Sequence, residues 1–192
     1  MGLPAEKYVM DRAAFIDWEA SQPEHKHEYW QGDVFAMTGA RQSHVIVSLN
    51  VATLLKNHLR GTPCRAYIAD MQLEVAAADA VFYPDVFVSC SPADLAAERV
   101  AREPQVVIEV LSDSTASVDR GRKFAAYRQL PSLREYVLID PDTRTVEVYR
   151  RVEDGNWLLA AREGERALVL PSLDFEAPLA DVFEDLAPQG QD

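Results

Sequence analysis

A short apolar run at residues 106–111 contains a single acidic side chain, Glu109. Such a run is typical of a strand that is buried on both faces of a sheet. Strand alternation puts Glu109 on the same face as Val107 and Leu111. An ionised carboxylate there is costly unless it is paired, hydrogen-bonded or bound to a cation. Glu109 therefore belongs to a functional site, to a structural ion pair with a helix arginine, or to a strand end that is less buried than its composition implies.

The chain before this strand is predicted to begin with a short helix followed by a hairpin. Asp11 is placed to cap a short helix in which Phe15 and Trp18 recur at helical spacing. Residues 27–37 predict a hairpin with its turn at 31–33.

A long helix follows the hairpin. We expect Ser43 to cap it and Gly61 to stop it. The apolar stripe expected to face the core consists of Val45, Ile46, Leu49, Ala52 and Leu59.

The rest of the chain alternates strands with one more helix. That helix begins at Ser114 or Thr115 and ends at Pro131, with Phe124, Ala125 and Tyr127 facing inward. β-Branched and aromatic residues predict strands at 65–68, 72–75, 81–89, 136–139, 145–150 and 157–161. This order indicates an α/β fold with a mixed β-sheet flanked by helices, not an all-parallel sheet.

Composition restricts the class of protein. The 192 residues include 31 Asp and Glu against 19 Lys and Arg, a formal net charge of −12. We expect a single domain over residues 1–187, large enough to need no disulfide or structural metal, and a disordered tail at 188–192. Cys64 and Cys90 have no C-x-x-C spacing and follow no signal peptide, which favours a reducing, cytoplasmic location. No apolar run approaches the roughly 20 residues of a membrane helix.

The acidity argues at first against nucleic acid as a partner, because Lys and Arg supply most of the non-specific affinity for phosphates. The charge is unevenly distributed, however. Six acids and no Lys or Arg follow Pro171, whereas residues 114–136 carry a local charge of +3. Net charge therefore leaves the partner open.

Asp85 is a second carboxylate in a strand-like segment. Pro84 before it tends to mark the edge, start or bulge of a strand, so an ordinary strand-entry turn is one interpretation. The chain between Asp85 and Glu109 is long enough to bring the two strands side by side. Two carboxylates on neighbouring strands would form a site for Mg²⁺ or Mn²⁺.

Lys123 lies on the helix after the buried strand, with Tyr127 one turn further along the same face. An ammonium beside a metal-bound water can orient the attacking hydroxide or stabilise charge on a phosphate. The alternative is a solvated lysine among Arg120, Arg122 and Arg128.

Four segments together resemble the Uma2-like family of endonucleases, in the PD-(D/E)XK restriction-endonuclease-like superfamily. They are residues 83–86 (YPDV), 104–114 (PQVVIEVLSDS), 119–124 (DRGRKF) and 133–140 (LREYVLID). The resemblance implies a restriction-endonuclease-like core with an N-terminal helix and hairpin and C-terminal strands. It also implies a divalent-metal site at the open end of the sheet.

By position, the resemblance makes Asp85 the aspartate of the Pro-Asp element and Glu109 the acid of the second element. The usual lysine two residues later is replaced by Leu111, and Lys123 on the next helix takes its role. Glu28, Asp70 and His44 match further polar positions of the family.

The resulting hypothesis is metal-assisted hydrolysis of phosphodiester bonds in DNA. Asp85, Glu109 and the carbonyl of Val110 would hold Mg²⁺ or Mn²⁺, and Lys123 would position the water. Glu28 would bind a second metal or orient Lys123. Tyr127, Asp70 and His44 are accessory candidates, and the phosphate track consists of Arg120, Arg122 and Arg128. The superfamily also implies a homodimer.

Two other classes stay open. The first is a catalytically silent interaction or regulatory protein that keeps the fold, and its mark is carboxylates that arginines satisfy without a cation. The second is a metal-dependent hydrolase of smaller phosphoesters.

Overall fold

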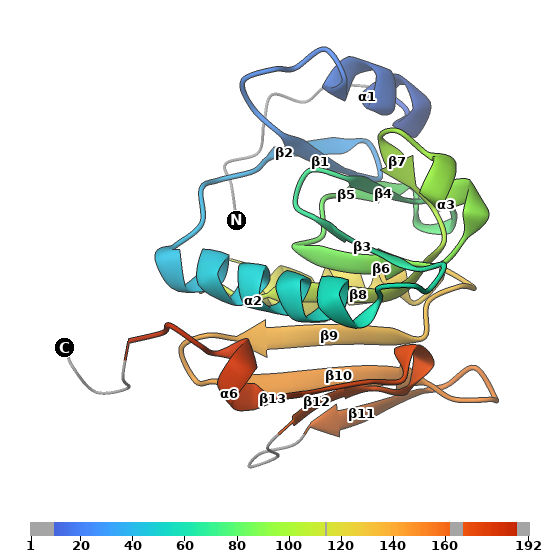
Figure 1. Ribbon diagram of the computed structural model, residues 1–192. Helices are drawn as coiled ribbons and strands as arrows, with labels where there is room; N and C mark the ends of the chain where they lie inside the picture. The colour runs from blue at the N-terminus through green and yellow to red at the C-terminus, as the bar shows by residue number, and fades with distance from the viewer. Residues whose placement is uncertain (1–9, 114, 162–166, 188–192) are drawn as a thin grey trace.

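A six-stranded sheet forms the central layer of the fold (Figure 1). The computed structural model describes residues 10–113, 115–161 and 167–187, so the tail predicted for 188–192 lies outside the described residues. The strand order is β11-β10-β9-β8-β6-β3, and only β8 and β9 run parallel. The bounds are β3 Arg65–Ile68, β6 Val86–Ser89, β8 Pro104–Val110, β9 Glu135–Asp140, β10 Thr145–Arg151 and β11 Trp157–Ala161.

A second, five-stranded sheet has the order β2-β1-β5-β4-β7, with β4 and β7 parallel. Its strands are β1 His27–Trp30, β2 Asp33–Ala36, β4 Gln72–Val75, β5 Ala80–Phe82 and β7 Val100–Ala101. The predicted hairpin is the β1–β2 pair. A separate antiparallel pair joins β12 Ala167–Leu170 to β13 Phe175–Pro178.

Helices and single turns cover these sheets. They are α1 Arg12–Glu19, α2 Gln42–His58, η1 Ala76–Ala78, α3 Pro92–Ala96, α4 Ala116–Val118, the π-helical turn η2 Asp119–Lys123, α5 Phe124–Tyr127, η3 Pro171–Leu173 and α6 Leu179–Val182. Asp11 caps α1 as expected, because its carboxylate accepts the amide N–H of Ala14. Within the described ranges, no helix combines the length and apolarity needed to span a membrane.

The central sheet buries both of its faces. Val106, Ile108 and Val110 of β8 pack with α2, α6 and the β12–β13 pair. Val107 on the opposite face packs with residues of the second sheet and with Tyr127 of α5. Strand β8 is therefore covered on both sides, as its apolar sequence predicts.

Residues 81–89 do not form one strand, which corrects the sequence-based prediction. The segment divides into β5 and β6, which belong to different sheets, and the chain crosses between the sheets at residues 83–85. Pro84 has no amide hydrogen to donate to a ladder, so a break in pairing there is physically natural. The crossing leaves Asp85 immediately before β6.

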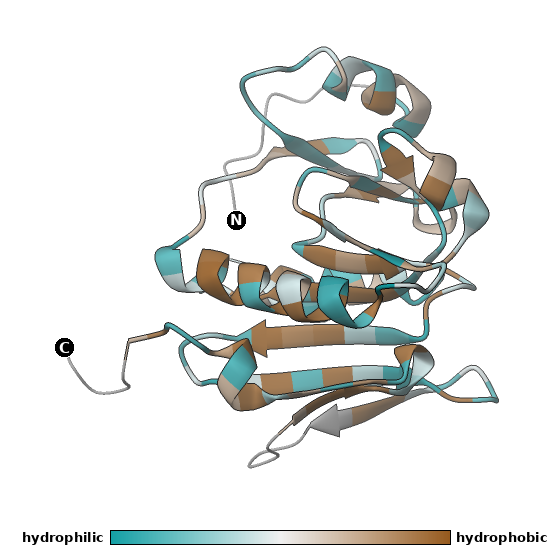
Figure 2. Cartoon of the chain, in the orientation of Figure 1, coloured by the Kyte–Doolittle hydropathy of each residue, from teal (hydrophilic) through white to brown (hydrophobic). Residues whose placement is uncertain are grey.

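The predicted start and inner face of α2 are also partly wrong. The helix begins at Gln42 rather than after a Ser43 cap. Val47, Val51 and Leu55 are its buried residues, while Val45 and Leu49 of the predicted stripe are 54% and 60% exposed. Hydrophobic residues occur along most of α2 (Figure 2), so periodicity alone does not identify the face that packs.

Cys64 and Cys90 are joined by a disulfide, which the sequence argument for a reducing setting gave no reason to expect. Arg65 pairs with Ser89 in the β3–β6 ladder, so the cysteines occupy the next pair of positions. Antiparallel pairing thus brings together two thiols that are 26 residues apart.

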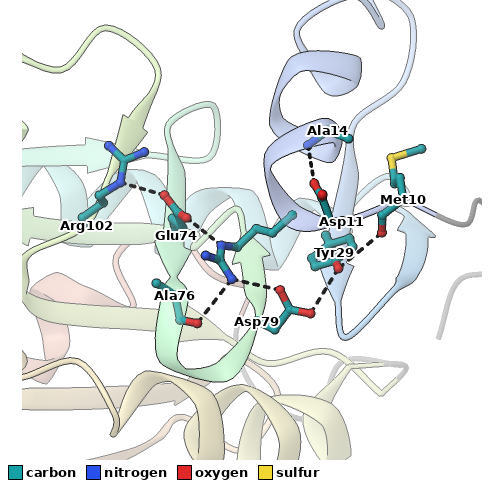
Figure 3. Close-up of polar contacts among 9 residues, drawn as sticks. Met10, Asp11, Ala14, Tyr29, Glu74, Ala76, Asp79 and Arg102 are labelled. Atoms are coloured by element: carbon teal, nitrogen blue, oxygen red, sulfur yellow. Dashed lines mark hydrogen bonds and ion pairs between the residues drawn. The ribbon is translucent and has the colours of Figure 1, made fainter.

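A polar network ties α1 to the second sheet (Figure 3). Glu74 accepts hydrogen bonds from Nε of Arg12 (2.6 Å) and Nε of Arg102 (2.7 Å). Asp79 accepts from Arg12 (2.9 Å) and from the hydroxyl of Tyr29 (3.1 Å). The buried charge of Glu74 is therefore matched by two guanidinium groups.

Candidate active site

Asp85 and Glu109 lie next to each other at one end of the central sheet. Strands β6 and β8 are antiparallel neighbours in which Val86 pairs with Ile108, so the residues just beyond this pair face each other. Oδ2 of Asp85 accepts the amide N–H of Val110 at 2.7 Å. The structure thus brings together the two carboxylates that the sequence places on adjacent strands.

The buried carboxylate of Glu109 is paired with a lysine and a tyrosine. Its Oε1 accepts from Nζ of Lys123 at 3.1 Å and from the hydroxyl of Tyr127 at 2.9 Å. Only 2% of Glu109 is exposed. The sequence also allowed Glu109 to form a structural ion pair with a helix arginine, but its partners are Lys123 and Tyr127.

Lys123 is shared among several acids. Besides Glu109, its Nζ lies 3.1 Å from Oε1 of Glu28 and 3.7 Å from Oδ1 of Asp119. Glu28 comes from β1, and its Oε1 also accepts the amide N–H of Tyr83 at 3.1 Å. One buried ammonium, on the π-helical turn η2, therefore contacts acids from the β1–β2 hairpin and from the central sheet.

Asp119 was not among the residues proposed from the sequence. It is 2% exposed and stands four residues before Lys123, a spacing that predicts an i,i+4 pair but not its burial. The intervening segment is a π-helical turn, a type of turn often found at functional sites. The turn changes the predicted inner face, because Ala126 and Tyr127 are buried whereas Ala125 is exposed.

The electrostatics of the site follow from burial and from an excess of acids. Burial raises the pKa of Glu109, and the charges of Asp85, Asp119 and Glu28 add to this effect, while Lys123 opposes it. Burial also raises the pKa of Asp119. For Lys123, burial acts to lower the pKa, but the surrounding carboxylates outweigh it, so its pKa is raised and the ammonium stays charged.

His44, on the first turn of α2, contacts the other carboxylate. Its Nε2 lies 3.2 Å from Oδ2 of Asp85. Burial lowers the pKa of His44, but the hydrogen bond and charge of Asp85 raise it more, and the net shift is upward. His44 therefore orients Asp85 and adds positive charge to the site as the pH falls.

These residues border a cavity of about 630 Å³. Glu28, Asp85, Glu109, Asp119 and Lys123 all line it, as does His44. The guanidinium of Arg122 also borders it, with Cζ 4.1 Å from the ring centroid of Trp30 and 5.1 Å from that of Phe35. The cavity thus combines an acidic floor with a cation held on aromatic rings.

A comparison with family models assigns the chain. The model described as "Uma2: Putative restriction endonuclease" matches residues 12–180. The chain belongs to the Uma2 family. This assignment confirms the resemblance seen in the sequence.

Two relatives from Synechocystis sp. (strain ATCC 27184 / PCC 6803 / Kazusa) are similar over most of their length. The "Uncharacterized protein slr1290" is 33% identical over 173 residues, which is 90% of each chain. The "Uncharacterized protein sll1609" is 32% identical over 169 residues, or 87% of this chain and 95% of the relative.

A solved structure shares the fold. It is described as a "putative nuclease belonging to DUF820" from Anabaena variabilis ATCC 29413. It matches with a TM-score of 0.71 and 19% identity over 91% of this chain and 97% of the other. The match confirms the predicted α/β class with mixed sheets flanked by helices.

Three residues proposed for this Uma2 family site lie elsewhere. Asp70 pairs with Lys26 and its side chain is 77% exposed. Arg120 donates two hydrogen bonds to Glu147 of β10. Arg128 is exposed at the end of α5 and is not among the residues that line the cavity. Of the three predicted arginines, the cavity therefore contacts Arg122.

The donor atoms of the site are those that hard divalent cations prefer. Among the described residues, no group of three or more His, Cys, Asp and Glu side chains is arranged to hold a metal ion. Mg²⁺, however, commonly takes only one or two carboxylates from a protein and keeps several waters. Asp85 and Glu109 supply that number, with Glu28 and Asp119 adding negative charge beside the same cavity. The residues present therefore fit such an ion.

Proposed function

We propose that this protein is a divalent-metal-dependent endonuclease that hydrolyses phosphodiester bonds in DNA. The observation that carries the proposal is the buried ammonium of Lys123, held by Glu28 and Glu109 at 3.1 Å each, beside Asp85 in one cavity. A buried lysine among acids on three separate elements is costly to assemble for stability alone. Such arrangements concentrate at catalytic sites.

The charge balance supports a cation as the missing partner. Five carboxylates line the cavity, and four of them, those of Glu28, Asp85, Glu109 and Asp119, lie around Lys123 and His44. In the described part of the chain, Lys123 and His44 are the basic groups that contact them. Negative charge therefore exceeds positive charge, and burial and mutual repulsion raise the pKa of Glu109. A divalent ion would relieve that repulsion.

The proposed ligands are Asp85, Glu109 and the main-chain carbonyl of Val110, with Mg²⁺ or Mn²⁺ as the ion. When bound, the ion would lower the pKa of a coordinated water and stabilise charge on the phosphate.

The protein's own groups have separate roles. Lys123 stays protonated and offers N–H donors to the attacking water or to a phosphate oxygen. Tyr127 fixes Glu109 by donating to its Oε1, and Glu28 fixes Lys123. His44 and the amide of Val110 fix Asp85 through its Oδ2. Each reacting group is therefore held before the substrate arrives.

The partner would be nucleic acid, with Arg122 as its phosphate contact at the cavity. A homodimer, which the superfamily resemblance implies, completes the proposal. The sequence favours a cytoplasmic location on the ground of unpaired cysteines, and the Cys64–Cys90 disulfide removes that ground.

The test is cleavage of labelled single-stranded and duplex oligonucleotides with Mg²⁺ and with Mn²⁺. We expect the wild type to cleave, and Asp85→Asn and Glu109→Gln to lose cleavage while keeping the wild-type circular dichroism spectrum. Glu147→Gln is the matched control, because Glu147 pairs with Arg120 away from the cavity and its variant should cleave normally.

Cleavage retained in both carboxylate variants would overturn the assignment. So would the absence of cleavage by the folded wild type with either metal, which would favour a protein that keeps the fold without the reaction. Hydrolysis of a small phosphoester such as p-nitrophenyl phosphate, with oligonucleotides left intact, would instead identify a metal-dependent hydrolase of smaller phosphoesters.

A further inference from the structure

The mouth of the active-site cavity is unusually apolar. Among the described residues, seven large hydrophobic side chains are exposed, and four of these line the cavity. The four are Met37 (38%), Val45 (54%), Leu49 (60%) and Ile68 (53%). They come from the segment after β2, from α2 and from the end of β3, so three distant parts of the sequence meet there. Gathering of this kind indicates a binding surface rather than chance exposure.

The same cavity holds a cation on aromatic rings. Arg122 lies over Trp30 and Phe35, and all three residues line the cavity. In the described part of the chain, Arg122 makes no ion pair, so its charge is available to a phosphate. Aromatic rings and arginine planes are the groups on which unpaired bases stack, whatever their sequence.

The cavity lacks the features that a duplex requires. Duplex affinity rests on many phosphate contacts along a track of Lys and Arg. Here Arg41 is paired with Asp142, and Lys123 is buried among acids. Arg122 is thus the one lining Lys or Arg, among the described residues, that is not paired with an acid.

The depth of the reacting groups leads to the same conclusion. Glu109 is 2% exposed and Lys123 is 8% exposed, and both line the cavity. A phosphodiester must therefore enter the cavity to reach them. A flexible strand can enter with its bases turned onto an apolar wall, whereas a base-paired strand must first be unpaired at a free-energy cost.

From these observations we infer that the cavity binds unpaired nucleotides, so that single-stranded DNA is the substrate this site prefers. Bases contact the apolar rim and the rings of Trp30 and Phe35. Arg122 contacts a phosphate, and the phosphodiester that reacts faces the Lys123 site. The inference names the substrate class of the nuclease proposed above and rests on that function.

The test measures binding separately from cleavage. Fluorescence anisotropy in EDTA compares a fluorescein-labelled oligothymidylate with the duplex that it forms with oligoadenylate. We expect the single strand to bind at least tenfold more tightly, which lies within what the stacking of one or two bases contributes. Arg122→Gln and the double variant Val45→Ala/Leu49→Ala should each weaken single-strand binding about fivefold or more.

Matched controls come from outside the cavity. Arg128→Gln removes an exposed arginine, and Leu158→Ala removes a 56% exposed leucine, neither of which lines the cavity. Both should leave the affinity for oligothymidylate unchanged. Alanine is well tolerated in helices, so the α2 double variant should fold normally.

Tighter binding of the duplex, or equal losses in cavity and control variants, would overturn the inference. A further pair of results would also overturn it: the protein fails to bind oligothymidylate, and analytical ultracentrifugation shows a dimer that Leu49→Lys dissociates. The apolar rim would then be a contact between two copies of the chain. Cleavage restricted to duplex DNA would overturn this inference and leave the nuclease function standing. Tight binding of the single strand without cleavage in the presence of any metal would overturn the nuclease function and leave the binding of unpaired nucleotides standing.

Discussion

Replacing Lys123 by methionine should be one of the most destabilising changes at this site. Methionine keeps most of the volume of the side chain but removes the ammonium. Glu109 and Glu28 then lose a cation at 3.1 Å, and Asp119 loses one at 3.7 Å. Removing one member of a buried ion pair leaves an uncompensated charge, which costs about 3–5 kcal/mol.

The loss is large enough to measure by thermal and urea unfolding. For a chain of this size, each kcal/mol lowers Tm by roughly 2–4 °C, so we expect a fall of about 6–20 °C. Glu109→Gln alone should cost far less, because Lys123 keeps Glu28 and Asp119 as partners. The double variant Lys123→Met/Glu109→Gln should recover about 2 kcal/mol relative to additivity, since one of the unpaired charges is gone.

The loss in Lys123→Met should also depend on pH. Burial raises the pKa of Glu109 and of Asp119 above their unfolded values, and Lys123 is the charge that opposes this effect. Without it both pKa values rise further, and the folded state binds more protons than the unfolded state. The stability of the variant therefore increases as the pH falls from neutral through the raised folded pKa values toward the ordinary carboxyl pKa near ~4.

Three results would refute this reasoning: a loss below about 1 kcal/mol, additive effects in the double variant, or stability of Lys123→Met that does not change relative to wild type between neutral pH and about pH 5. Any of these results would mean that Glu28, Glu109 and Asp119 do not depend on Lys123 for charge compensation.

Three further predictions concern the scaffold. Glu74→Gln should lower the free energy of unfolding by about 1–3 kcal/mol, because two arginines lose the carboxylate between them, and a urea titration against wild type measures it. Leu55→Ala should cost about 2–5 kcal/mol, whereas Leu49→Ala should change stability by less than about 0.5 kcal/mol; similar losses in both would contradict the observed packing face of α2. Replacing Cys64 and Cys90 by serine should cost about 3 kcal/mol for a closed loop with 26 residues of separation, and dithiothreitol should lower the Tm of the wild type alone.

Much of the site is accessible from the sequence because its signals are local and physically costly. An acid inside an apolar strand demands a partner, which identifies Glu109, and a proline before an acid marks the entry to β6, which identifies Asp85. Helical spacing puts Lys123 and Tyr127 on one face, but it leaves a solvated lysine open, and the resemblance to the Uma2 family is what gives Lys123 a role at the site. The structure places all four in contact or at adjacent positions.

The rest depends on which surfaces meet, and local patterns do not encode this. Apolar residues occur around most of α2, so only tertiary packing decides that Val47 is buried while Leu49 is exposed. Asp119 has the same sequence pattern as a surface i,i+4 pair, and the π-helical turn that buries it has no simple sequence signal. The Cys64–Cys90 disulfide depends on the register of β3 against β6.

The central claim is that Asp85 and Glu109 hold a divalent cation, and calorimetric titration of Mn²⁺ into the purified protein tests it without knowledge of the substrate. The account predicts saturable binding by the wild type and by the Glu147→Gln control, and loss of that binding in Asp85→Asn and in Glu109→Gln. Equal heats in all four proteins would contradict it, because the ion would then be held by other groups or not at all.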